Sequence, residues 1–272
     1  MKIPSFEGEL MAWISPIQGI KEQQLRTTLV KASSSQELSV FHLLLPLPSW
    51  APKVKWRSLA KAMRKATKYC LSFTAAGLKP ELAAVIARTH GETGSWKQTR
   101  ALVLERNALQ TRSLSSGKRL ESELRQRLQL LSQPQLELLA EGSSNDRLAM
   151  AWLAVLKRIQ LTVELTRDLL LNKLECSDAL LRRSDMTGFY ETAERLHPEL
   201  QALSDSSQKR VRSTVLAMLR EAGLLEGKAN RSGQLGTVQR PSLSPQALAL
   251  LGDDPDLRAG FLLKPKQRRA KR

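Results

Sequence analysis

The sequence predicts a mainly α-helical bundle that carries one small β-hairpin near its C-terminus. Aromatic residues make up only 4% of the chain and hydrophobic residues 42%, so leucine and alanine, which favour packed helices, must build the core. From Pro80 onward, short stretches with helical periodicity follow one another between capping residues. Short apolar pieces on both sides of the turn-forming letters "NRSG" then indicate the hairpin.

The first helices can be placed by their capping residues. "KPELAAVIARTHG" predicts a helix with Pro80 at its first position and Gly91 just past its end. "SSGKRLESELRQRLQLLS" predicts a helix over residues 116–131 that is capped by Ser115 or Ser116. Its leucines share one arc of the helix and are expected to be buried, while the opposite arc shows Lys118 and Arg125.

The stretch Ser144–Leu174 is the most hydrophobic part of the chain. Residues Leu148–Leu156 are consecutively apolar. A helix that is apolar on all sides is buried, so we expect this stretch to form the centre of the bundle.

A later helix, over residues 207–222, places cations opposite its apolar arc. Ser206 or Ser207 is expected to cap it, and Gly223 to close it in the left-handed conformation. The polar arc and its flank hold Lys209, Arg210, Arg212, Ser213 and Arg220. Such cations usually mark a solvated helix face, and the alternative is a helix laid against phosphate. The hairpin that follows carries Lys228 and Arg231 in its loop, an order found in winged helix-turn-helix modules.

These patterns divide the chain into five expected regions. They are an N-terminal extension (1–62), a helix-turn-helix region (63–140), a central helical bundle (141–205), a winged-helix-like region (206–263) and a disordered basic tail (264–272). If translation starts at Met63, the extension is absent from the native product.

The net charge of +17 at pH 7 limits the partners that the protein can have. Polyanions are favoured, namely DNA, RNA or an anionic membrane face. The apolar run Ser39–Trp50 is too short and too broken by proline to span a bilayer. Cys70 and Cys176 form no CxxC pair, which suits free thiols in a reducing compartment. We therefore expect a cytoplasmic protein that does not enter the membrane.

The residues indicate no catalytic site, metal site or cofactor. His42, His90 and His197 are isolated, without a partner at metal-ligand spacing. "GLLEGKA" and "SGKR" resemble fragments of a phosphate-binding loop, but neither has the required glycine and Ser/Thr positions. We expect a protein that is not an enzyme.

Two of the predicted helices are built alike. Both begin with two serines followed closely by lysine and arginine. In a helix-turn-helix protein, the start of the recognition helix approaches base edges, and its dipole and small polar residues meet phosphate. Cations at a helix start oppose the usual dipole preference. That mismatch favours a binding role over a solvated face.

From Tyr69 to about Leu263, the chain resembles the BrxA family of the BREX phage-defence systems. The resemblance rests on "YCLSFTAAGL", "ERNALQTRSLSSGKR", "LELLAEGSSNDRLAMAWLAVLKR" and "KRVRSTVLAMLREAGLL", which stand in family order. It implies a helical, non-catalytic DNA-binding protein with a NusB-like fold and helix-turn-helix elements. Such proteins are encoded beside a DNA methyltransferase, a phosphatase-like protein and an ATPase. Residues 1–62 have no counterpart in the family, and the basic tail is longer than usual.

The sequence thus leads to one hypothesis and one alternative. The hypothesis is a DNA-binding accessory factor of a BREX system, with double-stranded DNA and the other BREX proteins as partners. The expected DNA-binding residues are Arg112, Ser115, Ser116, Lys118, Arg119, Arg125, Lys209, Arg210, Arg212, Ser213, Arg220, Lys228 and Arg231. The matching family positions are Arg112, Ser115, Ser116, Lys118, Arg119, Lys209, Arg210 and Arg212. The alternative is a NusB-like RNA-binding or protein-scaffold module. The scarcity of aromatic residues argues against base stacking on single strands.

Overall fold

The computed structural model of the chain describes residues 69–71, 73–74 and 76–264. All of them belong to the second of the two units into which the chain divides, Ala62–Arg272. The expected N-terminal extension (1–62) lies outside the described residues, as does the expected basic tail apart from Lys264.

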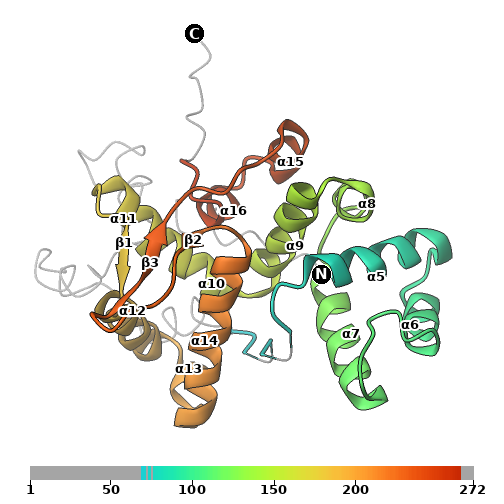
Figure 1. Ribbon diagram of the computed structural model, residues 1–272, viewed down its shortest axis with the longest axis horizontal. Helices are drawn as coiled ribbons and strands as arrows, with labels where there is room; N and C mark the ends of the chain where they lie inside the picture. The colour runs from blue at the N-terminus through green and yellow to red at the C-terminus, as the bar shows by residue number, and fades with distance from the viewer. Residues whose placement is uncertain (1–68, 72, 75, 265–272) are drawn as a thin grey trace, which may run out of the picture. The chain divides into compact units, whose positions relative to one another are not determined.

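The described residues form a mainly helical structure with one small antiparallel sheet, as the sequence predicts (Figure 1). The helices are α5 (Pro80–Thr93), α6 (Trp96–Glu105), α7 (Leu114–Leu128), α8 (Gln133–Glu141), α9 (Ser144–Arg158), α10 (Gln160–Glu164), the π-helix η2 (Leu165–Leu171), α11 (Asn172–Glu175), α12 (Arg183–Leu196), α13 (Pro198–Gln201), α14 (Asp205–Glu221), α15 (Pro245–Leu251) and α16 (Pro255–Gly260). The strands are β1 (Leu180–Arg182), β2 (Leu225–Glu226) and β3 (Gln234–Val238).

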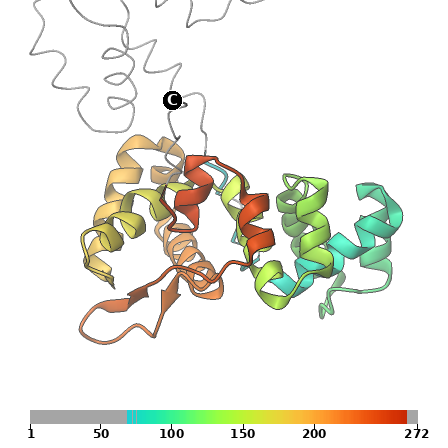
Figure 2. The ribbon, with the colours of Figure 1, turned by 90° about the horizontal axis from the view of Figure 1, so that it is seen from above.

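Helix α9 is the central helix of this unit. It packs against α5, α7, α8, α10, α15 and α16, and Figure 2 shows the red helices α15 and α16 beside it. Its residues Ala149–Leu156 are all buried and Leu148 is partly buried, which confirms most of the expected burial of the run Leu148–Leu156. The Trp152 indole N–H donates to the Gly260 carbonyl at 2.9 Å and so joins α9 to the end of α16.

The hydrophobic stretch does not form one continuous helix. It breaks at Ile159, whose backbone is extended (φ −113°, ψ 90°), and then continues as α10, η2 and α11. The Ile159 carbonyl accepts hydrogen bonds from the Thr162 N–H at 2.9 Å and the Thr162 hydroxyl at 2.7 Å. A β-branched residue followed by a threonine that bonds back to it provides the local reason for this break.

Helix α5 begins at Pro80 as predicted but runs through Gly91. It ends at Thr93, and Gly94 closes it with a φ of 63°. The prediction that Gly91 stops the helix was wrong because a second glycine, three residues on, takes the left-handed conformation instead.

Strands β2 and β3 pair antiparallel, so the predicted hairpin is confirmed. Strand β1 pairs antiparallel with the other edge of β3, and the sheet order is β1-β3-β2. The sequence did not predict β1, which has only three residues. Gly236 in β3 has a φ of 150°, and a Cβ atom there would lie 2.4 Å from the Glu226 carbonyl oxygen of β2.

We expect Gly236→Ala to lower the free energy of unfolding by about 1–3 kcal/mol, because the added methyl group collides with the backbone of β2 and the φ is strained. Urea unfolding followed by circular dichroism measures this. Gly91→Ala is the matched control: nothing lies within 4 Å of its new Cβ, and replacing a glycine inside a helix is expected to add about 0.5–1 kcal/mol. Equal effects of the two substitutions would contradict this account of the sheet.

Candidate nucleic-acid interface

Helix α7 begins with a serine-rich turn. Ser113 is the capping residue, and its Oγ accepts a hydrogen bond from the Ser116 N–H at 3.2 Å. The same hydroxyl donates to the Ser116 Oγ at 2.9 Å and lies 3.2 Å from the Ser115 Oγ. The prediction that Ser115 or Ser116 caps this helix was wrong, because both already lie in its first turn. Their exposed hydroxyls line the helix start.

Helix α14 begins with the same arrangement. Ser204 is the capping residue and accepts from the Ser207 N–H at 3.4 Å. Its Oγ donates to the Ser207 Oγ at 3.0 Å and lies 3.2 Å from the Ser206 Oγ. The cap is therefore not at Ser206 or Ser207 as predicted. Gly223 does have a left-handed φ, 71°, as predicted.

The two helix starts match residue by residue. In both, the cap opens the pattern S-x-S-S-x-K-R, so a lysine and an arginine follow the capping serine at the same two positions. These cations, Lys118 and Arg119 in α7 and Lys209 and Arg210 in α14, are all exposed. The first turn of α7 holds no acidic residue, whereas that of α14 holds Asp205. Of the two starts, α7 therefore offers the more favourable surroundings for an anion.

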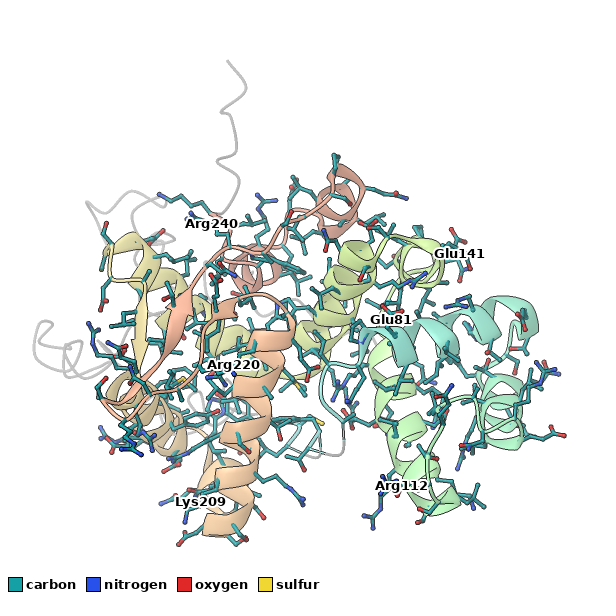
Figure 3. The ribbon with its side chains drawn as sticks, viewed as in Figure 1. Glu81, Arg112, Glu141, Lys209, Arg220 and Arg240 are labelled. Carbon is teal, nitrogen blue, oxygen red and sulfur yellow. The ribbon has the colours of Figure 1, made fainter. Side chains whose placement is uncertain are left out.

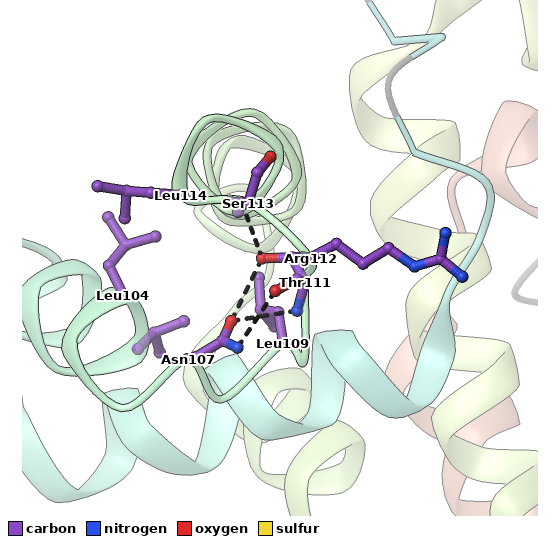
Figure 4. A pocket seen from close by; sticks show the side chains of 9 residues that line it. Leu104, Asn107, Leu109, Thr111, Arg112, Ser113 and Leu114 are labelled. Atoms are coloured by element: carbon purple, nitrogen blue, oxygen red, sulfur yellow. Dashed lines mark hydrogen bonds between the residues drawn. The ribbon is translucent and has the colours of Figure 1, made fainter.

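The loop before α7 is a hydrogen-bonded turn that leaves Arg112 exposed. The Asn107 side chain accepts from the Thr111 N–H at 3.1 Å and donates to the Thr111 carbonyl at 3.2 Å. A shallow cavity of about 260 Å³ is lined by this turn, by the end of α6 and by the start of α7. Figure 4 shows the Arg112 side chain extending away from the Asn107–Thr111 turn. Arg112 is thus free to meet a partner beside α7.

The hairpin loop adds further cations. Lys228 and Arg231 are both exposed. The Asn230 Oδ1 accepts from the Ser232 hydroxyl at 2.7 Å and from the Gln234 N–H at 3.0 Å, which fixes the turn between them.

The sequence reasoning missed the exposed Arg183 at the start of α12. Its backbone N–H donates to the Gly233 carbonyl at 2.8 Å, so it lies directly beside the hairpin loop. Arg183 stands far from the loop in the sequence, and the pairing of β1 with β3 brings the two together. The residues of the hairpin do not indicate that Arg183 lies beside its loop.

Two of the expected DNA-binding cations form ion pairs with acidic residues of the protein. Arg125 pairs with the buried Glu121 at 2.8 Å. Arg212 pairs with Glu194 at 2.8 Å, and its guanidinium carbon lies 4.8 Å from the centre of the Tyr190 ring.

Arg220 of α14 stabilises the hairpin. Its guanidinium donates to the Leu235 carbonyl at 2.7 Å and to the Gly227 carbonyl at 3.4 Å, which ties the hairpin to α14. The Ser213 hydroxyl likewise donates within α14, to the Arg210 carbonyl at 3.0 Å. The structure thus gives a partner within the protein to each of four expected DNA-binding residues: Arg125, Arg212, Ser213 and Arg220. Their binding roles stay predictions.

Figure 3 shows where the labelled cations lie. Arg112 beside α7 and Lys209 in α14 lie toward the same lower edge of the view, and both helices run upward from it. Arg240 lies toward the opposite, upper edge. We call the exposed cations of the two helix starts, the hairpin loop and the start of α12 the basic edge: Arg112, Lys118, Arg119, Arg183, Lys209, Arg210, Lys228 and Arg231.

Within the described part of the chain, no group of His, Cys, Asp and Glu residues could hold a metal ion. A search of the same residues finds no helix long and apolar enough to cross a membrane.

Fold and site together define a mainly helical protein with a small sheet and with two matched, serine-capped basic helix starts. The BrxA family model matches residues 67–253, and the chain belongs to the BrxA family. The BREX protein BrxA of Escherichia coli O9:H4 (strain HS) is 24% identical over 163 residues, which cover 60% of this chain and 73% of that protein. The crystal structure of an uncharacterized protein from Magnetospirillum magneticum has a similar fold, with a TM-score of 0.61 and 18% identity, covering 72% of this chain and 99% of that one.

Arg210 and Arg212 allow a direct test of which cations are structural. We expect Arg212→Ala to lower the free energy of unfolding by about 1 kcal/mol, because it removes a cation–π contact and a partly exposed ion pair. Arg210→Ala is the control, and its effect on stability is expected to stay within about 0.5 kcal/mol, as for an exposed residue. Thermal and urea unfolding compare the two variants. A larger loss of stability from Arg210→Ala would refute the assignment.

Proposed function

We propose that this protein is a non-catalytic accessory factor of a BREX phage-defence system that binds duplex DNA through the basic edge. The observation that carries the proposal is the duplicated helix start, with the same exposed lysine and arginine after the same serine cap. Membership of the BrxA family supports an accessory role in phage defence. The protein would act in the cytoplasm, with the BREX methyltransferase, phosphatase-like protein and ATPase as its protein partners.

The chemistry of each helix start suits a phosphate group. Exposed backbone N–H groups and serine hydroxyls can donate to phosphate oxygens, and serine is small enough to allow the backbone to approach closely. The lysine and arginine then neutralise the charge and release condensed counterions. These contacts position a protein on DNA and carry no sequence information by themselves.

The hairpin adds further exposed cations to those of the helix starts. Lys228 and Arg231 lie in its loop and Arg183 lies beside it. Arg220, in the last turn of α14, ties the hairpin to the end of that helix. A cationic loop anchored beside a basic helix favours a partner broad enough to touch both, and a duplex meets that requirement.

Two double variants test the proposal: Lys118→Ala with Arg119→Ala, and Lys209→Ala with Arg210→Ala. Each is expected to weaken binding to a fluorescent duplex of any sequence. Each should also reduce the slope of log affinity against log salt by about two units, because two phosphate contacts are lost. Fluorescence anisotropy across a potassium chloride series measures both quantities.

The control is Arg240→Ala with Lys264→Ala, which removes the same charge elsewhere. Arg240 lies toward the opposite edge (Figure 3), and it bonds to Leu262, two residues before Lys264. The control should change the slope far less. If all three double variants lost affinity and slope equally, binding would reflect net charge alone, and the assignment to the basic edge would be wrong.

A further inference from the structure

The segment Tyr69–Lys79, described apart from residues 72 and 75, contacts the last turn of α7. Arg127 of α7 is buried, with 2% of its surface exposed. Its guanidinium donates to three carbonyl oxygens of the segment, those of Gly77 at 2.7 Å, Ala76 at 3.0 Å and Phe73 at 3.3 Å. Burial lowers the pKa of this guanidinium, and the Glu123 carboxylate, 3.0 Å away, opposes that effect. The segment is therefore held to α7 by a buried, charge-assisted network.

The same segment contacts the last residue of α14. The Glu221 carboxylate accepts hydrogen bonds from the Leu78 N–H at 2.9 Å and the Lys79 N–H at 3.3 Å. Gly77 lies against it so closely that an added Cβ atom would be 3.0 Å from the Glu221 Oε1. Gly77 thus accepts a hydrogen bond from α7 through its carbonyl and lies beside the Glu221 side chain of α14.

The beginning of the segment is tied to α13 and to His197, the residue before it. The Tyr69 N–H donates to the Glu199 carboxylate at 2.7 Å, and the Tyr69 ring stacks on the His197 ring with 3.6 Å between centroids. The Tyr69 hydroxyl also bonds to Glu164 of α10. The beginning of the segment is therefore anchored to α10 and α13.

This segment contacts both basic helices. In the described part of the chain, α7 and α14 share no extensive contact with each other. Figure 1 shows the described part of the segment passing between them. The buried side chains of Phe73 and Leu78 join it to the core.

A small change at these contacts would be amplified at the helix starts. The contacts lie at the C-terminal ends of α7 and α14, whereas the lysine and arginine lie near their N-terminal ends. A helix of 15 residues is about 22 Å long, so a tilt of about 10° at one end moves the other by about 4 Å. That displacement exceeds the length of a charge-assisted hydrogen bond, about 2.8 Å.

We propose that Arg127, Gly77 and Glu221 are positioning residues that set the spacing between the two basic helix starts, so that one duplex is contacted by both. The inference rests on the proposed function. These residues touch no DNA themselves and act through the segment that joins the two helices.

Glu221→Ala tests the inference because positioning and electrostatics predict opposite results. Removing an acidic side chain raises the net charge, which on its own strengthens binding to DNA. If Glu221 sets the spacing, affinity for a duplex of about three helical turns should instead fall about tenfold, since the second contact is no longer favourably placed. Glu141→Ala removes the same charge from an exposed site on α8, far from Glu221 in the sequence, and is expected to leave affinity unchanged or higher.

A thermodynamic cycle then shows whether both starts act on one duplex. Lys118→Ala with Arg119→Ala is introduced into the wild-type and Glu221→Ala proteins. The loss of affinity that it causes should be several-fold smaller in the Glu221→Ala background, because the two contacts are already uncoupled. Glu221→Gln retains an oxygen acceptor for the Leu78 and Lys79 amides and should restore most of the affinity. A role in stability alone would not produce this coupling.

The outcomes separate the inference from the proposed function. If the wild-type protein binds no duplex, the proposed function fails. If it binds, but Glu221→Ala binds as tightly as Glu141→Ala and the cycle shows no coupling, only the positioning role is overturned. Circular dichroism checks the fold of each variant. Should Glu221→Ala not fold, Gly77→Ala, which pushes a methyl group against the Glu221 carboxylate, must weaken duplex binding in the same way, and unchanged affinity would overturn the inference.

Discussion

The buried Arg127 guanidinium is the interaction on which the arrangement of the two basic helices depends. It satisfies carbonyl groups of a segment that is neither helix nor strand, and buried polar groups left without partners are costly. Breaking a buried charge network by removing one partner typically destabilises a protein by about 3–5 kcal/mol. With Glu221 acting on the same few residues from α14, one short segment links two helices that share no extensive contact.

The duplicated helix start places its cations one turn inside each helix. Lys118 and Arg119 follow the Ser113 cap by five and six residues, and Lys209 and Arg210 follow the Ser204 cap by the same distances. The dipole effect falls off within the first turn, so the dipole penalty expected from the sequence does not apply to these cations. A phosphate at each start would meet the serine hydroxyls and the cations together.

Local patterns predicted much of this structure, and long-range pairing accounts for most of what they missed. The helical class, the buried run in α9 and the β2–β3 hairpin followed from periodicity and turn residues, which act over a few positions. Each cap was misplaced by two or three residues because several adjacent serines could fill the role, and only the backbone conformation of Ser113 and Ser204 decides it. Strand β1, the place of Arg183 beside the hairpin and the partners of Arg212 and Arg220 depend on residues distant in sequence, where local patterns give no signal. The Glu121–Arg125 pair is different, because its i,i+4 spacing within one helix can be read from the sequence.

The most direct test of the central claim is the binding of the purified protein to a labelled duplex and to a single-stranded RNA of matched length, each measured across a salt series. A duplex-binding protein should prefer the duplex and show a steep loss of affinity with salt, because several phosphates are neutralised at once. Preference for RNA, or no binding to either nucleic acid at moderate salt, would contradict the claim and favour an RNA-binding or protein-scaffold module.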